Sequence, residues 1–146
     1  MRRFAFVSAI LLGFTACTSV PHGDPEFMTL GSTLPYPFSP VVRVGNMLYL
    51  SGQIGTDSAG RLVPGGIRAE TRQTLNNIRD IVTRSGSSMD RVVKCTVMMA
   101  DMSEWPVMNE VYATYFPTHK PARSAFGATG LALNARTEIE CWALAK

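Results

Sequence analysis

Two stretches near the C-terminus, residues 121–126 (PARSAF) and 137–143 (TEIECWA), decide how this chain folds. Residue types alternate along both stretches, which predicts β-strands, because successive side chains of a strand point to opposite faces of its sheet. The first strand carries Arg123 and the second carries Glu138. If the two strands bring these side chains close together, a fork-shaped anion receptor lies beside a carboxylate that can orient water.

The same charges also have a simpler interpretation. Arg123 and Glu138 can form an ion pair between neighbouring strands, or both can face water together with Glu140. Exposed pairs contribute little to stability and need no functional explanation. Spacing alone favours this simpler interpretation over a binding site.

A hairpin and a helix precede these strands. Residues 41–50 predict two strands joined by a turn at Gly45-Asn46, a dipeptide that favours tight turns. Apolar residues then recur at three- and four-residue steps over residues 67–82, which predicts an amphipathic helix. We expect its solvent-facing side to include Glu70.

A third strand and a second helix complete the pattern. Residues 90–99 predict the strand, and Asp101 and Ser103 are candidate N-cap residues of a helix that ends before Pro117. We expect this helix to bury the apolar side chains of Trp105, Met108, Val111, Tyr112, Tyr115 and Phe116.

The order of these elements predicts an α+β fold with one sheet and two helices packed on one of its faces. The chain has 146 residues, of which 46% are hydrophobic, so it forms one domain with a substantial core. No helix is left to cover the second face of the sheet. We therefore expect oligomerisation to bury that face.

Several segments together resemble the reactive intermediate deaminase family, which is also called Rid or YjgF and is endoribonuclease L-PSP-like. Besides the two stretches above, the similar segments are residues 45–54 (GNMLYLSGQI), 74–78 (TLNNI) and 107–116 (VMNEVYATYF). The match covers about residues 34–146 in the family's order. It implies a chorismate-mutase-like fold and a homotrimer whose sheets form a central barrel, with a cleft at each subunit interface.

The resemblance also implies roles for residues of the two C-terminal strands. Arg123 matches the arginine that binds the substrate carboxylate, and the backbone N–H of Ala125 matches a second donor to that carboxylate. Glu138 matches the glutamate that orients or polarises the attacking water.

Three more residues match positions that line the family's cleft. They are Asn109 on the second predicted helix, and Ser51 and Gly52 at the end of the hairpin. Each also has a structural interpretation. Asn109 can form a cap or a helix-to-loop hydrogen bond, and Ser51-Gly52 can be an ordinary turn at the end of a strand.

Two segments depart from the family pattern. Residues 37–40 (PFSP) replace a Pro-Tyr-Ser-Gln stretch, so Phe38 stands at a cleft position where the family has a tyrosine hydroxyl. Ala125 replaces a frequent cysteine. Both changes bear on substrate range and rate, whereas neither removes the carboxylate receptor.

The start of the chain has the layout of a bacterial secretory signal. Basic residues precede an apolar run over residues 4–14, which is too short to be a permanent membrane span, and Cys17 follows two small residues. This pattern resembles a lipoprotein processing site, at which Cys17 is acylated. We expect a periplasmic protein that is held at a membrane by this lipid, or a cytoplasmic one if Met28 is the true start.

These patterns divide the chain into three parts. Residues 1–16 are the predicted signal peptide, residues 17–33 a flexible tether, and residues 34–146 the Rid-like domain.

The charge balance argues against a nucleic-acid partner. The chain carries 14 basic residues, of which Arg2 and Arg3 leave with the signal, so 12 remain against 11 acidic residues and the net charge falls from +3 to +1. A nearly neutral chain lacks the basic surface that phosphate backbones attract.

The cysteine and histidine residues predict neither a metal site nor a cofactor. Cys95 and Cys141 each lie in an apolar strand pattern, where they can be free buried thiols or, in an oxidising compartment, a disulfide. Only His22 and His119 are available as imidazole ligands, and no metal-ligand spacing or phosphate-binding loop is present in the sequence.

The leading functional hypothesis, implied by the resemblance, is hydrolysis of small 2-imino acids to 2-keto acids and ammonia without a cofactor. An export signal separates the protein from the cytosolic enzymes that release such imines. A non-enzymatic trimer that captures small carboxylates through Arg123 is therefore the alternative. An endoribonuclease agrees least with the charge balance.

Overall fold

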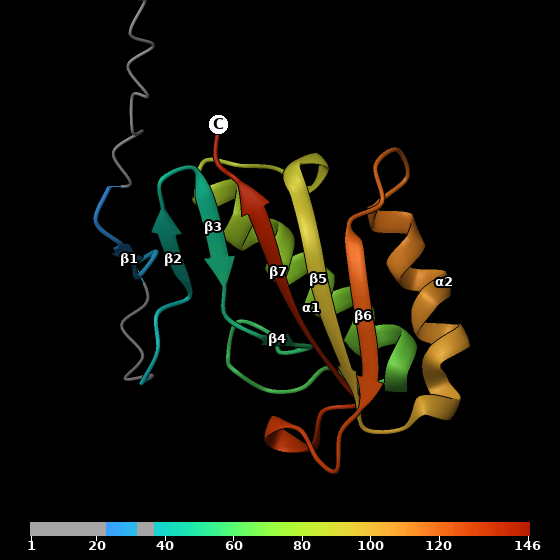
Figure 1. The fold of residues 1–146 in the computed structure, drawn as a ribbon. Helices are drawn as coiled ribbons and strands as arrows, with labels where there is room; N and C mark the ends of the chain where they lie inside the picture. Colours follow the sequence, from blue (N-terminus) through green and yellow to red (C-terminus); the bar gives the residue numbers. More distant parts are fainter. Residues whose placement is uncertain (1–22, 32–36) are drawn as a thin grey trace, which may run out of the picture.

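The computed structural model describes residues 23–31 and 37–146 (Figure 1). The predicted signal peptide and Cys17 lie outside these residues. Within the predicted tether, Glu26–Met28 forms strand β1, which pairs antiparallel with the strand that starts at Val41. The sheet therefore begins before residue 34, the expected start of the domain.

A single seven-stranded sheet has the order β1-β2-β3-β7-β5-β6, and the short β4 pairs with β7. The remaining strands are Val41–Val44 (β2), Met47–Leu50 (β3), Gln53–Ile54 (β4), Val92–Met99 (β5), Ala122–Gly127 (β6) and Thr137–Leu144 (β7). Neighbouring strands run antiparallel, except that β5 and β6 are parallel. A parallel pair needs a crossover connection, and the second helix provides it.

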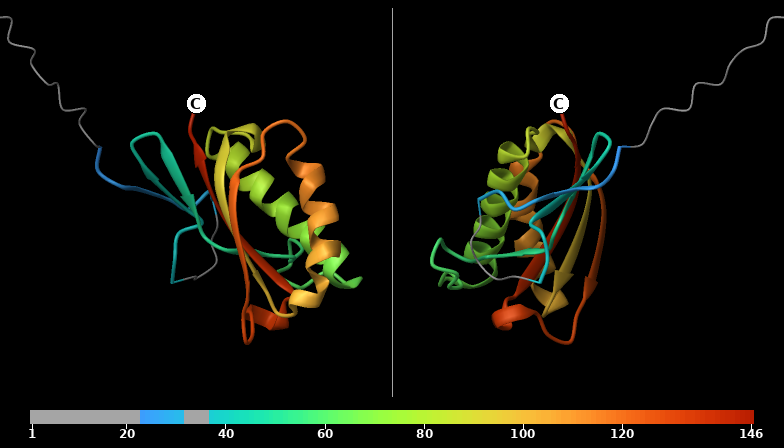
Figure 2. Two further views of the ribbon diagram at one scale, coloured as in Figure 1. Left: turned by 45° about the vertical axis from the view of Figure 1, so that its right-hand side comes forward. Right: turned by 90° about the vertical axis from the view of Figure 1, so that its left-hand side faces the viewer.

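Two helices, Gly66–Arg84 (α1) and Trp105–Tyr115 (α2), lie on one face of this sheet (Figure 2). The short 3-10 helices η1 (Met89–Arg91), η2 (Met102–Glu104) and η3 (Ala132–Asn134) lie in the connections. The predicted α+β architecture, with both helices on one side of a single sheet, is therefore confirmed. In the part of the chain that the structure describes, neither helix is both long and apolar enough to cross a membrane.

The core lies between the helices and the sheet. Apolar side chains from α1, α2 and the central strands are fully buried there, among them Leu48, Leu75, Ile78, Val97, Met108 and Ile139. Burying each such side chain stabilises the fold by about 1.5–3 kcal/mol relative to leaving it exposed.

Three local expectations were wrong. Glu70 is buried rather than solvent-facing, because its carboxylate accepts a hydrogen bond from the backbone N–H of Arg136 at 2.8 Å. Trp105 is 39% exposed, and it is the first residue of α2 rather than part of its buried side. Asp101 caps η2 by accepting a hydrogen bond from Ser103 N–H, and α2 begins only after η2.

Cys95 and Cys141 form a disulfide in the centre of the sheet. They are register partners on β5 and β7, their Cα atoms lie 4.1 Å apart, and both residues are fully buried. Periodicity placed each cysteine in a strand, whereas only the pairing of β5 with β7 placed one opposite the other.

Within residues 23–31 and 37–146, no helix covers the second face of the sheet, as expected. Figure 1 views the molecule from this side, with α1 behind the strands. Phe126 and Trp142 remain 50% and 40% exposed on it.

Candidate functional site

Arg123 and Glu138 lie on opposite faces of the sheet. Strand β5 separates β6 from β7, and Arg123 is in register with Cys95, which faces the helices. Glu138 is in register with Met98 and, through it, with Phe126 on the open face. The expectation that Arg123 and Glu138 meet within one chain is therefore wrong, and so is the ion pair proposed between them.

Arg123 lines a pocket of about 390 Å³ between α2 and the start of β6. Its guanidinium carbon lies 4.6 Å from the centre of the Tyr112 ring and 5.9 Å from that of Trp105. No other described residue accepts a hydrogen bond from this guanidinium or forms an ion pair with it. The guanidinium N–H groups are therefore available to an anion.

Two further predicted residues lie near Arg123. Asn109 lines the same pocket and is half-buried, and its side-chain amide forms no hydrogen bond with another described residue. The alternative of a cap or helix-to-loop hydrogen bond is therefore not what the structure shows. Ala125 is two residues further along β6 and shares the face of Arg123.

Sequence reasoning assigned Trp105 and Tyr112 only to the core. Both line the Arg123 pocket. With Asn109 they are spaced at i, i+4 and i+7, which places all three on one side of a helix. That spacing was the signal in the sequence that could have assigned Trp105 and Tyr112 to the pocket beside Asn109.

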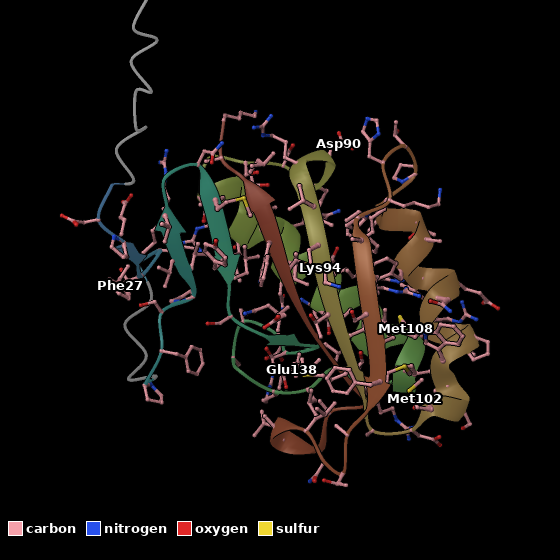
Figure 3. All side chains as sticks on the ribbon, in the orientation of Figure 1. Phe27, Asp90, Lys94, Met102, Met108 and Glu138 are labelled. Carbon is pink, nitrogen blue, oxygen red and sulfur yellow. A yellow bond between two sulfur atoms is a disulfide. The ribbon has the colours of Figure 1, made fainter. Side chains whose placement is uncertain are left out.

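Glu138 belongs to a second cluster, at the start of β7 beside β4 (Figure 3). Its half-buried carboxylate lies directly over the backbone of Gly52. A methyl group at Gly52 would overlap Glu138 Oε1 and lie 3.0 Å from Glu138 Cδ. Gly52 is therefore required for this position of the carboxylate, and the two predicted residues do come together.

Ser51 supports the segment that carries Phe38. Its hydroxyl donates to the carbonyl of Ser39 at 2.7 Å, and its backbone N–H donates to the carbonyl of Pro40 at 3.0 Å. Phe38 itself is 53% exposed. Ser51 thus holds the segment of residues 38–40 in place through hydrogen bonds rather than forming a turn only.

Gln53 is a member of this cluster that the sequence did not single out as a site residue. Its amide Nε2 donates to the carbonyls of Ser51 and Gly52, at 3.1 and 3.0 Å. These bonds hold the backbone over which the Glu138 carboxylate lies. Glu140, in contrast, accepts a hydrogen bond from Thr96 Oγ1 at 3.3 Å.

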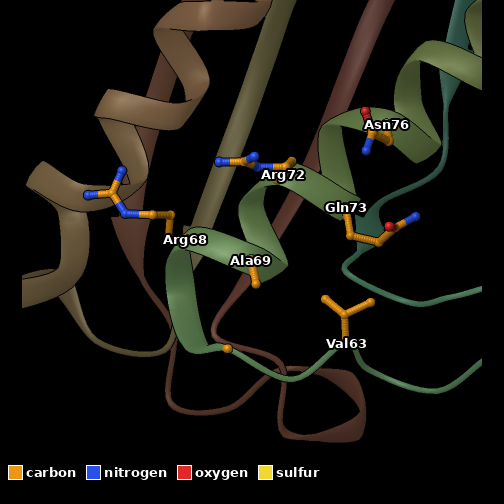
Figure 4. A pocket seen from close by; sticks show the side chains of 7 residues that line it. Val63, Arg68, Ala69, Arg72, Gln73 and Asn76 are labelled. Carbon is orange, nitrogen blue, oxygen red and sulfur yellow. The ribbon is translucent and has the colours of Figure 1, made fainter.

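A separate pocket of about 400 Å³ lies along the solvent side of α1 (Figure 4). Arg68 and Arg72 line it, and Arg68 forms an exposed ion pair with Glu110. It contains none of the predicted site residues. Among residues 23–31 and 37–146, no group of three or more His, Cys, Asp or Glu side chains could hold a metal ion.

Comparisons with known proteins agree with the predicted family. The family model described as Endoribonuclease L-PSP matches residues 32–145. A 2-iminobutanoate/2-iminopropanoate deaminase from Mus musculus is 43% identical over 109 residues, which are 74% of this chain and 81% of the mouse protein. The human protein of the same name is 41% identical over 109 residues, 74% of this chain and 80% of that protein.

Solved structures share the fold. Escherichia coli TdcF with bound serine superposes with a TM-score of 0.72 at 30% identity, covering 76% of this chain and 90% of TdcF. RidA from an Antarctic Psychrobacter bacterium superposes with a TM-score of 0.73 at 32% identity, covering 80% of this chain and 95% of RidA. The chain therefore belongs to the endoribonuclease L-PSP family, the Rid/YjgF family that its motifs predicted.

Proposed function

We propose that this protein hydrolyses small 2-imino acids to 2-keto acids and ammonia. The observation that carries the proposal is the guanidinium of Arg123, which lies in a pocket without a carboxylate or carbonyl partner among the described residues. Such a group binds a substrate carboxylate through two parallel hydrogen bonds. Two mammalian relatives named as 2-iminobutanoate/2-iminopropanoate deaminases support this reaction.

The site is completed between subunits of a homotrimer. Arg123 and Glu138 lie on opposite faces of one sheet, so a single chain cannot bring both to one small substrate. The exposed Phe126 and Trp142 on the open face support burial of that face against another copy. The Arg123 cluster of one subunit then faces the Glu138 cluster of its neighbour.

Hydrolysis in this cleft needs no cofactor, because an imine carbon is already electrophilic. Glu138 accepts a proton from water as the water oxygen bonds to the imine carbon, and then passes this proton to the imine nitrogen, which gives a tetrahedral carbinolamine. In the collapse of this intermediate the hydroxyl proton passes through Glu138 to the amino group, the C=O bond forms as the C–N bond breaks, and ammonia and the 2-keto acid are released. Arg123 holds the substrate carboxylate throughout, which converts the water attack into an oriented step.

A coupled assay tests this reaction. A threonine dehydratase generates 2-iminobutyrate, and formation of 2-ketobutyrate is followed with and without the protein. We expect the protein to accelerate this step, and Glu138→Gln to lower the acceleration about 10²–10⁴-fold because the water loses its proton acceptor. Gly52→Ala, which displaces the carboxylate, should lower it by up to about 10²-fold.

One control variant and one contradicting outcome make the result decisive. Glu140→Gln changes a neighbouring carboxylate on the same strand face and should retain full acceleration. A well-folded wild-type protein that leaves 2-ketobutyrate formation unchanged would contradict the proposed reaction and favour the carboxylate-binding alternative.

We also propose that the protein is exported and carries a lipid on Cys17. The signal-like N-terminus and the Cys95–Cys141 disulfide support export, because disulfides persist mainly in oxidising compartments. In a bacterial host the full chain should fractionate with membranes, and Cys17→Ser should move it to the soluble periplasmic fraction. Recovery of the unchanged full-length chain in the cytoplasm would contradict this proposal.

A further inference from the structure

Arg123 is held differently from the described arginines that pair with a carboxylate. Arg61, Arg68 and Arg136 each form such an ion pair. The guanidinium of Arg123 instead lies near two aromatic rings, and the closer ring is that of Tyr112. A carboxylate partner within the chain would occupy the donors that a substrate needs, whereas an aromatic ring contacts only the face of the guanidinium.

Tyr112 is itself firmly positioned. It is 7% exposed, and its ring packs against Phe116 with the ring centres 4.8 Å apart. Phe116 is almost completely buried, so the pair is anchored in the core beneath α2. Trp105, at 5.9 Å, lies near the limit of a useful cation–π contact and is partly exposed.

From this geometry we propose that Tyr112 is a positioning residue for Arg123. Its ring supports one face of the guanidinium, so that the N–H edge is presented to the substrate carboxylate in a fixed orientation. This proposal rests on the proposed function insofar as the anion is a substrate. A long arginine side chain otherwise loses rotamer freedom when it binds an anion, and prior support by the ring reduces that loss.

The hydroxyl of Tyr112 is not needed for this role. It is buried and has no hydrogen-bond partner among the residues described. Loss of hydration in this position raises the pKa of Tyr112 to about 12, although the nearby Arg123 opposes the shift. The side chain is thus a neutral aromatic ring at physiological pH, and a phenylalanine at position 112 should keep the positioning role.

The test compares rings of one shape and opposite electronic character. Wild type, Tyr112→Phe and a variant with pentafluorophenylalanine at position 112 are titrated with 2-ketobutyrate by isothermal calorimetry. We expect Tyr112→Phe to bind within about twofold of wild type, and the fluorinated ring to bind about tenfold more weakly because its face no longer attracts a cation. Tyr112→Leu, if it folds, should resemble the fluorinated variant.

The outcomes separate this inference from the proposed reaction. Equal affinity for the phenylalanine and pentafluorophenylalanine variants would show that the ring only fills space, and would overturn the inference. If 2-ketobutyrate affinity is lower for the fluorinated ring than for phenylalanine but 2-iminobutyrate is not turned over, the positioning role of Tyr112 would be supported and only the reaction contradicted. Failure of wild type to bind 2-ketobutyrate would overturn the inference, because Arg123 would then hold no carboxylate.

Discussion

Replacing Arg123 with alanine is expected to lower kcat/KM for imine hydrolysis by roughly 10³-fold. Two charge-assisted hydrogen bonds to the substrate carboxylate are lost, each contributing about 1.5–3 kcal/mol, and about 1.4 kcal/mol corresponds to a factor of ten. The Arg123 side chain forms no ion pair or hydrogen bond with another described residue, so the fold should survive its removal. Arg123→Lys should recover only part of the activity, because an ammonium group lacks the planar fork.

Arg68→Ala is the matched control for this loss. Arg68 is also a partly exposed arginine, but it lies on the solvent side of α1 and pairs with Glu110. Its removal should leave activity and assembly unchanged. Equal losses in both variants would mean that Arg123 acts through net charge and not through a specific site.

The Arg123→Ala variant also shows whether the site is shared between subunits. Arg123→Ala and Glu138→Gln proteins, each inactive alone, are unfolded together and refolded as mixed trimers. If each site takes Arg123 from one subunit and Glu138 from the next, random assembly restores about a quarter of the sites, as expected for a heterologous ring interface. No recovery in mixed trimers would contradict the shared site.

Loss of the Cys95–Cys141 disulfide is expected to be the largest single effect on stability. The bond closes a loop with a sequence separation of 46 residues. In the chain-entropy model, opening a loop of this size lowers the free energy of unfolding by about 4 kcal/mol. For a small domain this is a large part of the total, which is typically about 5–15 kcal/mol.

The measurement is urea unfolding at fixed protein concentration, because assembly also contributes to stability. Protein refolded with a reductant should unfold at much lower urea than oxidised protein. The double variant Cys95→Ala/Cys141→Ala should respond equally in both conditions. Equal midpoints for oxidised and reduced wild type, with free thiols verified by alkylation, would contradict the prediction.

Local patterns in the sequence determined the elements and their faces. Alternation along residues 137–143 correctly predicted a strand, in which Glu138 and Glu140 share the face opposite Ile139, because a strand turns every second side chain the same way. The helical period of α1 and the hairpin at Gly45 were equally local and were confirmed. The family motifs were also readable from the chain, and the comparisons confirmed the family.

The candidate site depended on neighbours that no local pattern reveals. Gly52 was predicted from its motif alone, and only the pairing of β4 with β7 showed that it makes room for the Glu138 carboxylate. The contact between Tyr112 and Arg123 likewise joins a helix to a strand across the crossover between β5 and β6.

The sequence by itself thus determined both helices and most of the strands, the apolar side of most of these elements, and which residues match the family's motifs. The tertiary structure decided the order of the strands. By placing β5 between β6 and β7, it joined Cys95 to Cys141 and put Arg123 and Glu138 on opposite faces. Strand order is set by packing between distant segments, whereas the face of a residue is set by the geometry of its own strand.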